Sequence, residues 1–186
     1  MNIWKLFYVL RVFFSSFFLK TNEYIRYYTV EITRPTEGSP APYTAGDVIS
    51  DSTTAPTLPS ITLDADPAAR MGVIVFFTRI QTNNVLWAST RFKVHFFSNT
   101  ITPHNDNATY EMKYTNATKR NGSVDVAMDT ANLGTTDSVA GFNDYNKIAM
   151  EPAANVMNLQ LQVLDAKTPI SEQKYTIQVG VIIKKY

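Results

Sequence analysis

The feature that most constrains this chain lies near its C-terminus, where two runs of residues alternate between apolar side chains and polar or small ones. The apolar positions are Met157, Leu159, Leu161 and Val163 in the first run and Tyr175, Ile177, Val179, Val181 and Ile183 in the second. A period of two places one face of each strand in a core and the other toward water. Two such strands are not stable alone, so the rest of the chain must supply a sheet that covers them. The pattern predicts an antiparallel β-sandwich.

The segment between the two runs, residues 165–173, is polar and contains Pro169. Proline cannot donate a hydrogen bond to a neighbouring strand, and a parallel pair would need a helical crossover. We therefore predict that the two C-terminal strands are antiparallel neighbours.

Further strand-like segments precede this pair. They span residues 24–34, 60–63, 73–80, 86–98, 109–114, 123–128 and 145–150. The segment 73–80 is apolar at nearly every position, which predicts a strand covered on both faces. Turn chemistry is expected at 82–84, at Asn121-Gly122 and at 64–67, and 129–144 is expected to be loop. Residues 35–59, rich in Pro, Ser and Thr, are expected to form a long ordered loop or surface strap.

About eight strands with no repeat of fixed period predict an all-β fold. Eight antiparallel strands in two sheets match a jelly-roll-like sandwich over residues 21–186, and another Greek key is the alternative. The 186-residue chain has no cysteine, which excludes disulfides and cysteine zinc sites. Its net charge of +1 offers no field that would collect nucleic acid or an anionic membrane.

Residues that could carry chemistry are few. His95 is expected on the polar face of a strand and His104 in a loop, without a spaced set of further metal ligands. The runs around Asp64 and Asp106 lack the twelve-residue calcium loop and are typical of turns. No nucleophile elbow, phosphate-binding glycine loop or HExxH motif is present. We expect no enzyme, no metal and no cofactor, although a glycosidase with two distant carboxylates stays open.

Residues 1–20 form a separate hydrophobic arm. The run 3–19 is short for a membrane span and carries Lys5 and Arg11, and it lacks the small-residue cleavage motif of a secretory signal. Helical and strand spacing both give an apolar face, so periodicity does not choose between them. An arm docked on a neighbouring subunit, a membrane anchor or signal, and an artefact of the start site remain the alternatives. Its apolar content implies a partner.

From about residue 25 to 183 the sequence resembles a family of small structural proteins of tailed bacteriophages, described as head decoration, cement or minor structural proteins. The resemblance rests on Ile32-Thr-Arg-Pro35, Tyr43-Thr-Ala-Gly-Asp-Val48, Arg91-Phe-Lys-Val-His-Phe-Phe97, Pro103 with Asp106-Asn-Ala-Thr-Tyr110, and Leu161-Gln-Val-Leu-Asp-Ala-Lys-Thr-Pro169. It implies a β-sandwich on the outer capsid surface of the virion, bound to the major capsid protein. It also implies a homo-oligomer such as a trimer, without catalysis.

The expected function is therefore to bind the capsid lattice and stabilise contacts between capsomers. Aromatic side chains of the arm are the expected anchors, inserting into a groove on the capsid or a sister subunit. These residues are Trp4, Phe7, Phe13, Phe14, Phe17 and Phe18. The alternatives are a connector, tail or fibre-base protein at low copy number, a carbohydrate-binding or hydrolytic module, and a membrane-associated protein with 3–19 in lipid.

Overall fold

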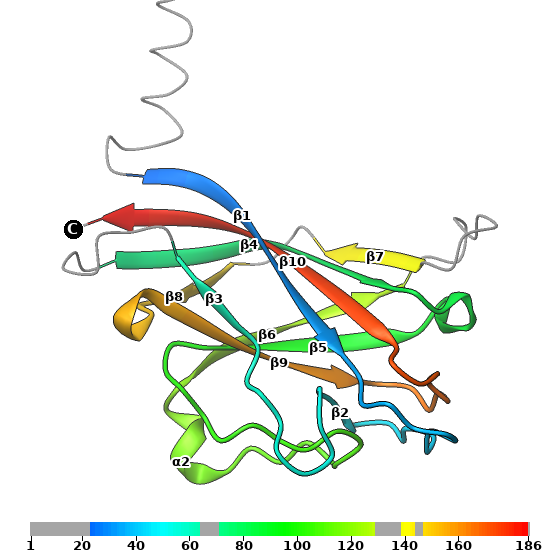
Figure 1. Ribbon diagram of the computed structural model, residues 1–186. Coiled ribbons are helices and arrows are strands. Elements are labelled where there is room, and N and C mark those ends of the chain that lie inside the picture. The colour runs from blue at the N-terminus through cyan, green and yellow to red at the C-terminus, as the bar shows by residue number, and fades with distance from the viewer. Residues whose placement is uncertain (1–22, 64–70, 129–138, 144–146, 186) are drawn as a thin grey trace, which may run out of the picture.

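The computed structural model describes residues 23–63, 71–128, 139–143 and 147–185 of the chain, and these residues form two antiparallel sheets packed face to face (Figure 1). The first, sheet A, contains β1 (Glu23–Thr33), β10 (Lys174–Lys185) and β4 (Met71–Thr82) in that order, with β7 (Val139–Asn143) and β8 (Ile148–Met150) both on the far side of β4. The second, sheet B, has β2 (Val48–Ile49) and β3 (Ser60–Thr62) on β9 (Val156–Val163), followed by β5 (Arg91–Phe97) and β6 (Arg120–Ala127).

The strand order is that of a jelly roll. Two strands of this fold are each divided into two short pieces that pair with the same neighbouring strand. β2 and β3 both pair with β9, and β7 and β8 both pair with β4. Counting each split strand once gives eight strands that pair first with eighth, second with seventh, third with sixth and fourth with fifth. That is one long antiparallel hairpin rolled up, closed by β10 on β4 and β9 on β5. The predicted all-β, jelly-roll-like sandwich is confirmed.

The core lies between the sheets and is filled by the predicted alternating positions. Each of the apolar residues predicted to face inward on β9 and β10 is fully buried. At one end of the core the indole of Trp87 stacks on Phe92 with ring centroids 5.7 Å apart and meets Tyr175 and Tyr43 edge-on. These aromatic contacts join the loop before β5 to both sheets.

One predicted pairing is wrong. β9 and β10 are not neighbours, because β9 is flanked by β5 and by β2 and β3, whereas β10 is flanked by β1 and β4. The connection 164–173 crosses from sheet B to sheet A, and its ten residues easily span the roughly 10 Å between stacked sheets. The two strands face each other across the core.

Two of the predicted turns are also wrong. Residues 82–84 do not close a hairpin; they lead from sheet A into a 3-10 turn, η1 (Val85–Trp87), so the next strand begins at Arg91. The side chain of Asn84 stabilises this crossing. Its Oδ1 accepts a hydrogen bond from the backbone N–H of Leu86, and its Nδ2 donates to Oε1 of Gln173. Asn121 and Gly122 lie inside β6, where a register shift opposite Phe96 and Phe97 accommodates them.

Three smaller expectations also change. Residues 109–114 form no strand, and a four-residue helix, α2 (Tyr114–Ala117), ends that loop. Residues 139–143, expected to be loop, form β7. The outer face of β4 is not covered, since Ile74 is 40% exposed. The predicted turn at 64–67 falls outside the described residues, as does the arm. In the part of the chain that is described, no helix has the length and hydrophobicity needed to cross a bilayer.

Candidate functional site: a buried ion pair at the loop end

A salt bridge lies buried where β1 ends. Arg34 directly follows β1, and its Nε and Nη2 donate to Oδ2 of Asp106, in the loop after β5, at 3.0 and 2.6 Å. The two side chains are 1% and 0% exposed. A buried charge is tolerated only when it is paired and hydrogen-bonded, and this pair fulfils both conditions.

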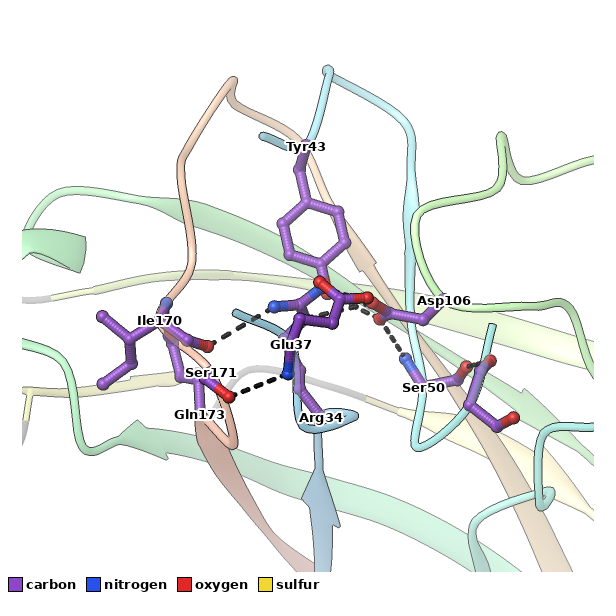
Figure 2. A network of polar contacts seen from close by, with 9 residues as sticks. Arg34, Glu37, Tyr43, Ser50, Asp106, Ile170, Ser171 and Gln173 are labelled. Carbon is purple, nitrogen blue, oxygen red and sulfur yellow. Dashed lines mark hydrogen bonds and ion pairs between the residues drawn. The ribbon is translucent and has the colours of Figure 1, made fainter. Parts of the chain in front are cut away.

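The second carboxylate oxygen of Asp106 is also fully used. Its Oδ1 accepts from the hydroxyl of Tyr43 at 2.6 Å and from the backbone N–H of Ser50 at 3.0 Å (Figure 2). Burial raises the pKa of Tyr43 well above its usual value, so the hydroxyl stays protonated and donates. The guanidinium of Arg34 also lies over the Tyr43 ring, 5.0 Å from its centroid. We call Arg34, Tyr43, Ser50 and Asp106 the loop staple.

The loop staple joins three segments that are distant in sequence. Nη1 of Arg34 donates to the carbonyl of Ile170 at 3.4 Å, and its backbone N–H donates to the carbonyl of Gln173 at 3.0 Å. Nη2 reaches Glu37, whose backbone N–H is held by the hydroxyl of Ser171 (Figure 2). Three segments are thus held at one end of the sandwich: residues 34–50, which follow β1 and form the first part of the strap, the loop around residue 106, and the connection 164–173.

The arrangement does not leave these groups free for acid–base or metal chemistry. Burial favours a lower pKa for Arg34, but the hydrogen bond to Asp106 and the charge interactions with Tyr43, Asp106 and Glu37 together raise the pKa, so the guanidinium stays charged. Asp106 accepts four hydrogen bonds from Arg34, Tyr43 and Ser50, which leaves it no lone pair for a metal. Among the described residues, no group of three His, Asp or Glu side chains is placed to hold a metal ion.

The two histidines come together on the outer side of sheet B, on the ring of Tyr110. His95 stacks on that ring with centroids 4.1 Å apart, and His104 approaches it to 5.2 Å. The loop that carries Tyr110 covers His95, so the expected polar face of β5 is buried at this position.

Each imidazole hydrogen-bonds a glutamine of β9. Nε2 of His95 lies 3.0 Å from Oε1 of Gln162, and Nδ1 of His104 lies 2.9 Å from Oε1 of Gln160. Burial lowers the pKa of His95 to about 4. Nδ1 of His95 is buried without a hydrogen-bond partner, so this imidazole is held neutral by desolvation.

The structure and the sequence prediction overlap only in part at these sites. The six predicted arm residues, Trp4, Phe7, Phe13, Phe14, Phe17 and Phe18, lie outside the described residues. The loop staple was not predicted. Its signal was nevertheless present, because Arg34, Tyr43 and Asp106 each belong to a different motif on which the phage-family resemblance rests. Their separation, 72 residues between Arg34 and Asp106, concealed that they meet.

No protein-family model and no curated protein matches the sequence. Among solved structures, the chain is similar to one from Desmodium yellow mottle tymovirus, at 10% identity and a TM-score of 0.26 over 90% of both chains. A chain of the Israeli acute paralysis virus full particle shares 13% identity at a TM-score of 0.33, over 89% of this chain and 74% of that one. PRD1 vertex protein P5 shares 11% identity at 0.32, over 82% and 94%. Likenesses this distant carry no argument for function.

Proposed function

We propose that this protein is a non-enzymatic structural protein of a tailed-bacteriophage virion, which binds the outer capsid lattice and stabilises contacts between capsomers. The observation that carries the proposal is the loop staple. It brings together residues from three of the motifs that resemble the decoration and cement family, and it uses them to hold the end of the sandwich in one conformation. Because these motif residues surround the buried ion pair of Arg34 and Asp106, they favour a rigid contact surface over a catalytic pocket.

Rigidity suits this role for a physical reason. A binding surface made of loops loses free energy when the loops must be ordered on contact, and fixing them beforehand removes that cost. Here the strap and two long loops are held by buried hydrogen bonds before any partner arrives. A cement protein resists internal pressure through the interface it adds across capsomer edges, and a standard interface buries roughly 1,600 Å² in total.

The hydrophobic arm, residues 1–20, supplies the anchor in this proposal. The six proposed anchor residues are all large aromatic residues: Trp4, Phe7, Phe13, Phe14, Phe17 and Phe18. Large aromatic side chains in desolvated pockets dominate the energetics of protein interfaces. The partner is the major capsid protein, and the subunits act as a homo-oligomer such as a trimer on the capsid surface.

The test is a binding titration on capsid shells that lack this protein. A chain without residues 2–20 should lose shell binding while it keeps the circular dichroism and unfolding midpoint of a folded sandwich. Tyr114→Ala, which removes an exposed aromatic side chain outside the arm, should bind like the full chain. Shell binding that survives the deletion contradicts the anchor. Turnover of a polysaccharide, or binding on a glycan array without shell binding, would favour the carbohydrate module instead.

A further inference from the structure

The outer face of sheet A carries an apolar strip that runs across the strands. The strand register aligns Ile25 with Ile182, Ile182 with Ile74, and Ile74 with Ala149. The next outward row consists of Tyr27, Gly180 and Phe77, with Phe76 in the adjoining bulge. We call these side chains the outer strip: Ile25, Tyr27, Ile74, Phe76, Phe77, Ala149 and Ile182.

On β1, β10 and β4 the outer strip is bounded on both sides by rows without large apolar side chains. Toward the start of β1 the row is Glu23, Lys184 and Gly72, and toward its end the row is Thr29, Gln178 and Arg79. The strip therefore crosses four strands but is only about two rows wide. Outward residues of a β-sandwich are ordinarily polar, so an apolar band of this shape marks a contact surface.

The strip is open in the described structure. Ile25 is 42% and Tyr27 58% exposed. Beside Ile74 and Ile182 the surface is hollowed into a cavity of about 330 Å³, which Gly72 and Glu23 also line. Tyr27 leans over Gly180 and meets Phe76 and Phe77 edge-on at 5.9 and 6.0 Å between centroids.

We propose that, in the free protein, the outer strip is the docking site of residues 3–19 of the same chain. The described chain begins at Glu23, which lines the cavity, and the hydrophobic segment ends only four residues earlier. Because the strip runs across the strands and begins on β1, one turn of about a right angle at residues 20–22 lays the segment along it.

The dimensions fit a helix. Seventeen residues span about 26 Å as a helix but about 56 Å as a strand. The strip crosses three strand spacings, about 14 Å, plus the side chains at its two ends. The apolar face of such a helix consists of Ile3, Leu6, Phe7, Leu10, Phe13, Phe14 and Phe17, and helical geometry turns Lys5, Ser15 and Ser16 away from it. A helix about 10 Å wide also matches the narrow strip.

Docking of the segment on its own chain is favoured over docking on another copy, because the linker keeps the segment close to its own strip. A short linker gives the segment an effective concentration in the millimolar range at its own strip, whereas another copy in dilute solution is present at far lower concentration. The consequence for the shell rests on the proposed function: four of the six proposed anchor residues, Phe7, Phe13, Phe14 and Phe17, lie on the helical face that the strip would hold. Lattice binding then releases the arm from the strip, so the arm is covered until a capsid groove competes for it.

The experiment uses the purified full-length protein without particles, so its outcome does not depend on the proposed function. The chain has no cysteine, so introduced cysteines react without background. The test pair is Phe14→Cys with Ile74→Cys, and the control pair is Phe14→Cys with Tyr114→Cys, whose second position is 90% exposed on α2 (Figure 1).

Under mild oxidation we expect the test pair to form a disulfide within one chain at least about tenfold faster than the control pair, seen as a monomer-sized band and mapped by mass spectrometry. Equal rates for the two pairs, or no bond in the test pair, would overturn the docking site. A bond that forms only between two chains would overturn docking within one chain. Unfolding midpoints of both variants, compared with the parent, establish that each is folded.

Discussion

At the scale of single residues, the loop staple makes the sharpest prediction for stability. Asp106→Asn keeps the shape of the side chain but removes the charge that balances Arg34, whose side chain is buried. Removing one partner of a buried ion pair costs about 3 to 5 kcal/mol, because the remaining charge is left uncompensated. Urea unfolding should show a loss of stability in that range.

Asp165→Asn is the matched control for Asp106→Asn. Asp165 pairs with Arg91 at 2.6 Å, and its hydrogen bond to Arg91 lowers its pKa, but Arg91 is largely exposed to solvent. Exposed pairs contribute about 0 to 1 kcal/mol, so this variant should unfold close to the parent midpoint. Equal losses in the two variants would show that the staple contributes no more than a surface pair.

His95 predicts an acid-sensitive component of stability. Its pKa falls from 6.5 to about 4 on folding because the ring is desolvated, with Lys93, Arg120 and His104 adding to the effect and the bond to Gln162 opposing it. Between these values the unfolded chain binds the proton and the folded chain does not. Stability is therefore lost as the pH falls from 6.5 toward 4, by about 2 kcal/mol between pH 7 and pH 5.

Comparing the parent with His95→Gln isolates this component, because the carboxylates titrate similarly in both chains. Urea unfolding at pH 7 and pH 5 should show a smaller difference for His95→Gln, by about 2 kcal/mol. The same pH difference in both chains would mean that His95 takes up its proton in the folded protein.

Residue-level contacts were the part of the molecule least accessible to sequence reasoning. In the sequence, Arg34 is simply the residue before Pro35, and Asp106 belongs to a run typical of turns. No local pattern indicates that two residues 72 positions apart form an ion pair. His95 was expected on a polar strand face. Only the fold brings Tyr110 over it, because the loop after β5 turns back onto sheet B.

At the scale of elements, Gly180 tests how tightly β10 packs at its bulge. A Cβ built on Gly180 would lie 2.9 Å from Cε1 of Tyr27 and 3.0 Å from Cβ of Phe77. The tyrosine ring can move, but the Cβ of Phe77 is fixed to the backbone of β4. Gly180→Ala should therefore destabilise the protein by about 1 to 3 kcal/mol, as overpacking does.

The control for Gly180→Ala is Gly38→Ala. No atom lies within 4 Å of a Cβ at Gly38, so the change should stay within about 0.5 kcal/mol of the parent in urea unfolding. If Gly180→Ala is equally neutral, β10 and β4 can separate at the bulge without cost.

Strand positions were predictable from the sequence, whereas strand neighbours were not. Alternation gives the buried face of β9 and β10, and all their predicted core positions are buried. Alternation does not say which strand lies alongside, and the ten-residue connection 164–173 suits a hairpin as well as a crossing between sheets. At Asn121-Gly122 the pairing of β6 with β5 overrides a local turn preference.

At the scale of the whole molecule, a long hairpin rolled into two sheets brings three connecting segments to one end, where hydrogen bonds join them (Figure 1). The outer strip lies at the other end of sheet A, near Glu23, the first described residue. In the proposals made above, the loop end is the contact surface and the outer strip is the docking site of the arm.

The central claim is that the protein is a structural component spread over the capsid lattice, and its copy number tests this most directly. Quantitative mass spectrometry of purified particles gives the ratio of this chain to the major capsid protein. The account predicts a ratio near stoichiometric. A handful of copies per particle would place the protein at a neck, tail or fibre base, and its absence from particles would contradict a virion structural role altogether.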